Sequence, residues 1–222
     1  MSTNRTGKQA RRLLGCLAGA AMLLTAQMTS AGTITGTAHD FSSNAWAGGQ
    51  ICVVCHAPHN TPLPAAGPLW NHALSVATYT VYASPTLDAT ALAQPGSVSR
   101  LCLSCHDGTV AINSFGGVTG TSFVGGSNLL GTNLSNDHPI GLTYDAALVT
   151  ADGALNPITT PVTIGLGGTR SRAGTIASNM LFGGRLECAS CHDVHNTFTA
   201  ITNNLLKVPI AGSTLCLTCH AK

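Results

Sequence analysis

Four short segments of the 222-residue chain share one pattern: two cysteines three residues apart, with a histidine directly after the second. These segments are Cys52-Val-Val-Cys55-His56, Cys102-Leu-Ser-Cys105-His106, Cys188-Ala-Ser-Cys191-His192 and Cys216-Leu-Thr-Cys219-His220. Residues i, i+3 and i+4 share one face of a helical turn. Two thiols on that face can bond the two vinyl groups of a porphyrin, while the histidine binds its iron as the proximal ligand. The pattern therefore predicts four covalently attached c-type haems.

Zinc binding and disulfide formation are the alternative uses of paired cysteines. Neither requires a histidine directly after the second cysteine. A disulfide within such a short loop also removes little entropy from the unfolded chain. Because the histidine recurs in all four copies, haem attachment is the interpretation that accounts for the whole pattern.

Each haem iron has a second axial position, and the remaining histidines are the main candidates to fill it. Three of the four methionines lie in the first 28 residues, so Met180 alone is left and at most one haem is methionine-ligated. Five further histidines remain for four positions. We predict bis-histidine haems, with His72 as a spare histidine packed beside Trp70. The predicted distal ligands are His39, His59, His138 and His195.

The motifs also form a degenerate repeat that suggests which histidine serves which haem. The first and third motifs read C-x-x-C-H-x-x-H-N, and each is followed by an L-C-L-x-C-H motif. A histidine one turn beyond a proximal ligand cannot reach the far face of the same iron, but it can bind a neighbouring haem. We therefore expect His59 to bind the haem at His106 and His195 the haem at His220. The other two irons would be served by His39 and His138, in an order that the repeat does not fix.

Residues 1–31 have the layout of a secretory signal peptide. Basic residues precede an apolar run from Leu13 to Leu24, and small residues follow, with a cleavage site after Ala31. The run is shorter than the roughly 20 residues of a membrane-spanning helix, and no later segment is long enough either. We therefore expect an exported protein that is extracellular, on the cell surface or periplasmic, and that does not span a membrane after cleavage.

Charge and composition narrow the function further. Removing the signal takes four of the ten Lys and Arg residues, so six basic residues face eight acidic ones. A net charge of −2 argues against a nucleic-acid partner. Aromatic residues make up 5% of the chain and charged residues 8%. Side chains alone would supply only a thin core, so we expect the haems to fill the interior.

The expected fold is mostly irregular coil wrapped around four haems, with short helices at the CxxCH turns and a few short strands. Residues 32–222 would form one tetrahaem cytochrome domain. Within it, two-haem units at about 39–115 and 181–222 are joined by a Gly/Thr/Ser-rich segment that carries His138. Strand candidates are 76–82 and 158–164, the latter limited to a sheet edge by its prolines, and 165–170 is expected to be a turn.

Together the motifs resemble the doubled-CxxCH multihaem c-type cytochromes, in particular the tetrahaem extracellular cytochrome filament (nanowire) proteins of the OmcE type. The resemblance covers nearly all of 32–222. It is carried by residues 39–42, 52–60, 68–71, 102–111, 137–141, 181–196 and 215–220. It implies four bis-histidine haems with distal ligands at His39, His59, His138 and His195. The chain departs from the pattern at His72, where relatives often have arginine.

Three functions are compatible with these features. Filament members of the family imply head-to-tail copies with stacked haems and one haem ligated from a neighbouring subunit, so the leading hypothesis is a conductive extracellular filament. A monomeric periplasmic electron shuttle is the alternative. A multihaem reductase needs an open iron, and the histidines suffice to close every site, so we do not expect an enzyme. Expected partners are further copies of the chain, redox partner proteins and extracellular electron acceptors. Ligation by His39 across a subunit boundary would favour the filament.

Overall fold

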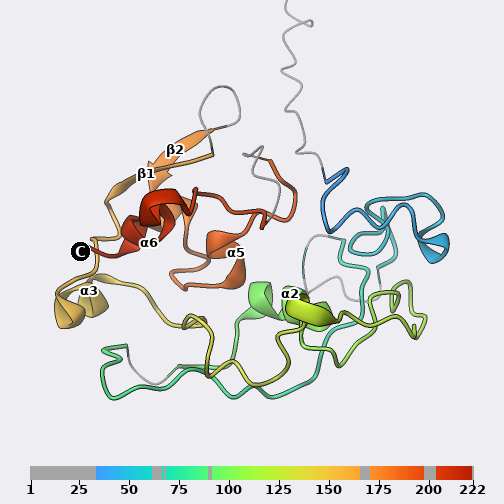
Figure 1. Ribbon diagram of the computed structural model, residues 1–222, viewed down its shortest axis with the longest axis horizontal. Coiled ribbons are helices and arrows are strands. Elements are labelled where there is room, and N and C mark those ends of the chain that lie inside the picture. Colours follow the sequence, from blue (N-terminus) through green and yellow to red (C-terminus); the bar gives the residue numbers. More distant parts are fainter. Residues whose placement is uncertain are drawn as a thin grey trace, which may run out of the picture. The chain divides into compact units, whose positions relative to one another are not determined.

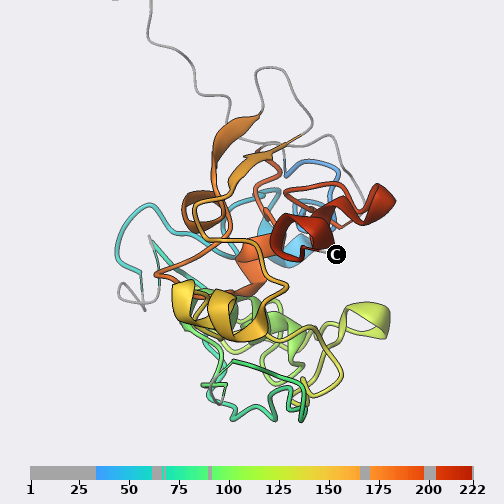
Figure 2. The same cartoon turned by 90° about the vertical axis from the view of Figure 1, so that its left-hand side faces the viewer.

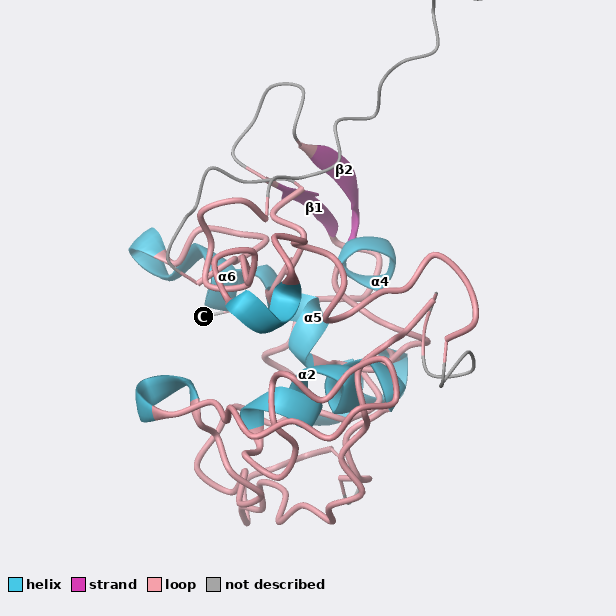
Figure 3. Ribbon diagram, turned by 90° about the vertical axis from the view of Figure 1, so that its right-hand side faces the viewer, coloured by secondary structure: helices cyan, strands magenta, loops and turns pink. Residues whose placement is uncertain are grey.

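The computed structural model describes residues 34–61, 67, 69–89, 92–165, 171–197 and 204–221. The expected signal peptide at 1–31 and most of the expected turn at 165–170 lie outside these residues. Gly32–Lys222 forms one compact unit. Most of it is loop, interrupted by short helices and one two-stranded sheet (Figure 3). That this coil wraps haems stays a prediction. Among the described residues, no helix has the length and apolar character needed to cross a membrane.

Helical structure concentrates at the CxxCH motifs. The second motif ends α2 (Ser97–His106), the third forms α5 (Cys188–Cys191), and the fourth ends α6 (Thr214–Cys219). The first motif is a single turn outside any named helix. In the first, third and fourth motifs the histidine N–H donates to the carbonyl of the first cysteine, at 2.8, 3.1 and 2.9 Å. This i to i+4 bond places both thiols and the imidazole on one turn.

The helices α2 and α5 contact each other (Figure 1), which brings the second and third motifs together. Close packing requires Gly96 at the start of α2, because a Cβ atom there would lie 2.1 Å from a carboxylate oxygen of Glu187. Leu103 on the buried face of α2 is fully enclosed. The helix ends at Asp107, whose N–H donates to the carbonyl of Leu103 at 2.8 Å.

A small antiparallel sheet and its adjoining helix form the second structured region. Strand β1 (Pro161–Ile164) pairs with β2 (Arg172–Thr175), with Val162 opposite Gly174 (Figure 2). Pro161 is the first residue of β1, a position where its missing N–H is tolerated in a sheet. Helix α4 (Ile176–Asn179) follows directly and begins with a capping box between Thr175 and Ser178.

The remaining elements are short. Helix α3 (Ala146–Asp152) begins where the Asp145 carboxylate accepts the N–H of Leu148 at 2.9 Å, and it ends at Gly153 in the left-handed region. The described residues also include three single-turn 3-10 helices: η2 (Ala45–Ala47), η3 (Gly126–Asn128) and η5 (Ala211–Ser213).

The apolar core is divided into two clusters. The larger one packs α3, β1 and α4 together, and it consists of Leu142, Tyr144, Leu148, Ile164, Ile176, Met180, Leu186 and Val208. The smaller one contains Tyr79, Leu103 and Leu134. Met180 is 1% exposed within the larger cluster, so its side chain packs as an ordinary core residue.

The prediction of a strand at 76–82 was wrong. Among the described residues, this segment makes only an isolated bridge between Thr80 and Asn133. The backbone of Tyr79 is bonded instead by the side chain of Gln94, which accepts its N–H at 2.8 Å and donates to its carbonyl at 2.9 Å. A side chain therefore takes the place of a partner strand. The other candidate, 158–164, contains β1 in its second half.

Candidate functional site

Three of the four motif histidines face a second histidine from elsewhere in the chain. The ring centroids are 6.0 Å apart for His56 and His195, 6.0 Å for His106 and His39, and 6.4 Å for His220 and His138. In each pair one member follows a CxxC and the other is one of the predicted distal histidines.

This spacing suits a metal ion between the two rings. Two metal–imidazole bonds of about 2.0 Å, plus about 1.1 Å from each bonding nitrogen to its ring centre, would separate the centres of two axial ligands by about 6.2 Å. The three observed distances all lie close to that value. Among the described residues, no three His, Cys, Asp or Glu side chains gather closely enough to hold a metal ion by themselves. The recurring arrangement is a pair of imidazoles, which fits a haem whose porphyrin supplies the other iron ligands.

Hydrogen bonds orient several of these imidazoles for ligation. Nδ1 of His106 lies 2.8 Å from the carbonyl of Asn128, and Nδ1 of His192 lies 2.7 Å from the carbonyl of Asn204. Nδ1 of His138 lies 3.0 Å from the carbonyl of Pro139 in the same way. A carbonyl only accepts, so Nδ1 carries the proton in each ring. The lone pair of the neutral ring is then on Nε2, the form in which a histidine binds a metal.

Two buried nitrogens next to the pairs have no hydrogen-bond partner among the described residues: Nδ1 of His39 and Nε1 of Trp70. Trp70 packs edge-on against His56, with ring centroids 6.1 Å apart. Buried polar atoms rarely stay unsatisfied, so each position fits a larger polar group beside it. Burial, together with the charges of His106 and His192, lowers the pKa of His39 to about 4. Its imidazole is therefore neutral at physiological pH.

The expected pairing of motifs and distal histidines is not the one in the structure. His195 faces His56 of the first motif, not His220 of the fourth. The cause is local: the Asp193 carboxylate accepts the N–H groups of His195 and Thr197, at 3.2 and 2.6 Å, and this turn directs the chain after α5 toward the first motif.

The haem expected to take His59 is also paired differently. His106 faces His39, whose N–H donates to the hydroxyl of Thr37 at 3.2 Å in a tight turn. His39 was also our candidate to act across a subunit boundary, and here it lies against a motif of its own chain. His138 faces His220 and completes the third pair.

His59 and His192 remain without a histidine facing them in the described part of the chain. Both side chains are exposed. His192 has the same Nδ1 hydrogen bond as His106, so its ring is oriented as the paired ones are. One proximal and one distal histidine are thus left over, and both face solvent.

His72 is a packed histidine. It is fully buried, and both ring nitrogens are engaged: Nδ1 lies 2.7 Å from the carbonyl of Ala73 and Nε2 lies 3.0 Å from that of Ala111. Its ring lies edge-on to Trp70 at 6.5 Å between centroids. With both nitrogens directed at carbonyl oxygens, neither one is free to bind an iron. This arrangement agrees with the interpretation of His72 as the spare.

No disulfide joins any of the eight motif cysteines, all of which are among the described residues. In each successive pair of motifs, a cysteine of one motif raises the pKa of a cysteine of the other. The neighbouring thiol of Cys188 raises the pKa of Cys102, and burial, Cys105 and Cys55 raise it further. The pKa of Cys191 is raised by burial and also by Cys216. The first motif is therefore near the second, the second near the third, and the third near the fourth.

A buried carboxylate stabilises the segment after the second motif. Asp107 is 4% exposed and accepts hydrogen bonds from the hydroxyls of Ser75 and Tyr79, at 2.5 and 2.7 Å. Thr109 donates to it through both its N–H and its hydroxyl. Burial opposes ionisation of Asp107, but these bonds outweigh it and hold its pKa below the usual value. In the sequence, the position of this buried carboxylate is marked by an aspartate directly after the motif histidine.

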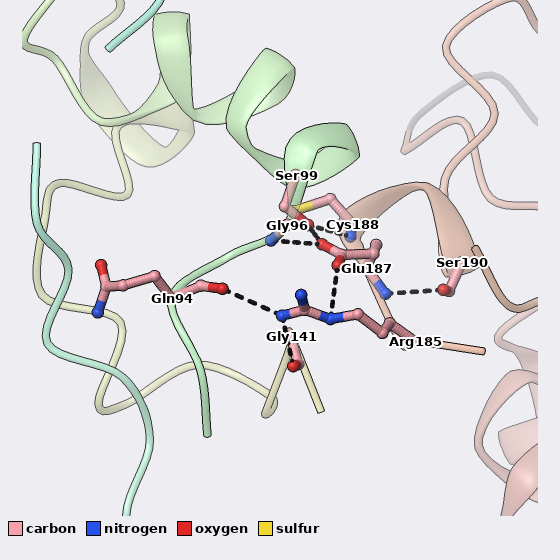
Figure 4. A network of polar contacts seen from close by, with 8 residues as sticks. All are labelled: Gln94, Gly96, Ser99, Gly141, Arg185, Glu187, Cys188 and Ser190. Atoms are coloured by element: carbon pink, nitrogen blue, oxygen red, sulfur yellow. Dashed lines mark hydrogen bonds and ion pairs between the residues drawn. The ribbon is translucent and has the colours of Figure 1, made fainter. Parts of the chain in front are cut away.

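A second buried carboxylate joins the second and third motifs (Figure 4). Glu187 is 3% exposed, and it accepts hydrogen bonds from the hydroxyl of Ser99 and, at 3.2 Å, from the N–H of Gly96. The Ser99 hydroxyl in turn accepts the N–H of Cys188 at 3.0 Å. The Nε atom of Arg185 lies 3.4 Å from the same carboxylate. Sequence reasoning missed Glu187, since an acidic residue before a CxxCH motif does not reveal that it is buried.

Comparison with known proteins adds no further identification. No family model matches the chain, and no curated protein matches it either. The resemblance to multihaem cytochromes therefore rests on the motifs and on the geometry of their histidines.

Proposed function

We propose that the chain is a tetrahaem c-type cytochrome that transfers electrons as a subunit of an extracellular filament. The observation that carries the proposal is the set of three histidine pairs at 6.0–6.4 Å, each joining a CxxCH histidine to a distal one. The three pairs involve residues far apart in the chain, so local sequence does not account for them.

When bound, haem supplies a one-electron redox couple. The protein would position each haem and keep substrates away from its iron. The cysteines would hold each porphyrin edge against a short turn. The Nδ1 hydrogen bonds of His106 and His192 hold these rings with Nε2 available for a metal. Two axial histidines would leave an iron with no open position, which favours electron transfer over a reductase. The adjacency of successive motifs suits transfer from each site to the next.

The leftover histidines favour assembly of copies. Exposed His59 and exposed His192 are one distal and one proximal ligand, and in a polymer His59 of one copy would complete the site of His192 in the next. A contact of this kind between two different surfaces does not close on itself and generates an open helical filament. This assigns the bridging role to His59 in place of His39. In the alternative, a monomeric shuttle, His59 would reach His192 within its own chain.

Electron microscopy of the purified, haem-loaded protein tests the proposal, together with haem quantitation. We expect four haems per chain and filaments in which haem density is unbroken. The variant His59→Ala should keep four haems but lose the filaments and gain one high-spin haem. The matched control Thr61→Ala, two residues away, should still form filaments.

Other outcomes would change the assignment. Discrete particles with four low-spin haems would replace the filament by a monomeric shuttle. A high-spin haem in the unmodified, fully assembled protein would indicate an open iron and favour a reductase. Fewer than four haems per chain would contradict the tetrahaem assignment itself.

A further inference from the structure

The charged side chains around the third motif are arranged asymmetrically, and the inference drawn from them rests on the proposed function. On one side is Glu187, whose carboxylate lies between α2 and α5. It contacts Ser99 of the second-motif helix and precedes the first cysteine of the third motif, Cys188. At 3% exposure it is well shielded from water, so its charge is weakly screened.

The counter-charge of Glu187 lies toward solvent. The Arg185 side chain is 32% exposed, and its guanidinium also donates to the carbonyls of Gln94 and Gly141, at 3.1 and 2.7 Å. Figure 4 shows it on the side of Glu187 away from Ser99. The negative end of this ion pair is therefore the end that faces the second and third motifs.

A buried cation lies on the other side of the third motif. Lys207 is 7% exposed, and its ammonium donates to the carbonyl of Asn179 at 3.0 Å and lies 4.9 Å from the ring centre of Phe182. Its backbone N–H donates to the carbonyl of Cys191 at 2.8 Å.

Other charged groups reinforce the asymmetry or are better screened. Buried Asp107 follows His106 and adds negative charge at the second motif. Asp193 is the carboxylate that acts on Lys207, but it is partly exposed and its oxygens already accept two backbone N–H groups. Val208, next to Lys207, packs in the cluster that includes Cys219 of the fourth motif. Negative charge thus lies at the second motif and between it and the third. Positive charge lies on the 207–208 segment, which contacts the third motif and packs in the cluster of Cys219.

We propose that Glu187 and Lys207 set a gradient of reduction potential along the haem relay, which lowers the potential on the second-motif side and raises it on the fourth-motif side. An anion near a haem disfavours the added electron and a cation favours it, and both effects are strong where water is excluded. The pair makes transfer toward the fourth haem the downhill direction. Neither Glu187 nor Lys207 is among the proposed iron ligands, so each would act on the haems through its charge alone.

Potentiometric titration of the full-length, haem-loaded protein at pH 7 tests this gradient. Glu187→Gln keeps the shape of the side chain and removes its charge, so at least one haem should shift to higher potential. Lys207→Met should shift at least one haem to lower potential. We expect about a tenfold change in the oxidised-to-reduced ratio at a fixed potential, or about 59 mV for a one-electron couple. Asp88→Asn, which removes an exposed carboxylate, is the control and should leave all four potentials unchanged.

The two variants should shift the reduction potential in opposite directions, and this distinguishes an electrostatic role from a structural one. Loosened packing would shift potentials in the same direction in both variants, and that result would overturn the proposal. Unchanged potentials in variants that carry four low-spin haems would also overturn it while leaving the cytochrome assignment intact. If the unmodified protein bound no haem, the proposed function itself would fail, and haem quantitation reports this separately.

Discussion

The imidazole rings of His56 and His195 are stacked, with centroids 6.0 Å apart and planes inclined by 21°. One ring belongs to the first CxxCH motif and the other follows the third, so this contact connects the two-haem units at 39–115 and 181–222. The structure thus joins these two segments through a histidine pair. Under the proposed function, His195 would be a ligand exchanged between the two-haem units.

Replacement of His195 tests which haem it serves. His195→Phe removes the second ligand, so one of the four haems should become high-spin in optical and electron paramagnetic resonance spectra. The high-spin signal should vanish when both cysteines of the first motif are also changed to serine, because the affected haem is then absent. It should persist when the cysteines of the fourth motif are changed instead. The reverse pattern would restore the pairing of His195 with His220.

His72 should be dispensable for ligation but not for stability. In His72→Asn all four haems should stay low-spin, since neither nitrogen of His72 is available to an iron. The free energy of unfolding should fall by about 1–3 kcal/mol, because at least one buried carbonyl loses its partner. Denaturant titration and optical spectra measure the two effects. His138→Phe is the comparison and should produce one high-spin haem; a high-spin haem in His72→Asn would show that His72 is a ligand.

The hydroxyl of Tyr79 should contribute measurably to stability through Asp107. Burial raises the pKa of Tyr79 to about 12, so the hydroxyl stays protonated and donates to the carboxylate at 2.7 Å. Tyr79→Phe should therefore lower the free energy of unfolding by about 1.5–3 kcal/mol, as expected for a hydrogen bond to a charged group. Tyr82→Phe, at a partly exposed position three residues on, should change it by less than about 0.5 kcal/mol. Equal effects of the two substitutions would contradict this role of Asp107.

Acid should weaken the fold in a window set by His39. Burial lowers its pKa in the folded state from 6.5 to about 4, so the unfolded chain binds more protons between these values. Stability is therefore fully present above pH 6.5 and is lost as the pH falls toward 4, by up to about 3 kcal/mol. Iron ligation also requires the neutral ring and acts in the same direction.

The pH effect is measured by denaturant titrations at pH 7, 5.5 and 4. The slope of stability against pH should be shallower in His39→Phe, whatever the absolute stability of that variant. A slope that is the same in both proteins would show that another group is responsible.

The sequence predicts what depends on nearest neighbours along the chain. Cysteine and histidine at i, i+3 and i+4 predict each haem-attachment turn. Counting shows that one of the five further histidines is spare, and the neighbouring Trp70 singles out His72. Which rings meet depends on turns whose direction no short pattern encodes, such as the one that Asp193 forms before His195. The carbonyls of Asn128 and Asn204 that orient proximal histidines are backbone groups and leave no residue-type signal. Burial of Glu187 and Lys207 likewise arises only once α2, α5 and the 204–208 segment are packed.

The contact between α2 and α5 depends on the absence of a side chain at Gly96. Its backbone φ of −69° is open to any residue, so the requirement is steric: an added Cβ would lie 2.1 Å from an oxygen of Glu187. Gly96→Ala should lower the free energy of unfolding by about 1–3 kcal/mol, the usual cost of overpacking. Gly125→Ala is the control, because its φ is −141° and nothing lies within 4 Å of the added Cβ. Because Glu187 must move to admit the methyl group, Gly96→Ala should also change the potentials of the haems beside it, whereas Gly125→Ala should not. A Gly96→Ala protein as stable as its control would show that the Glu187 carboxylate can move aside at little cost.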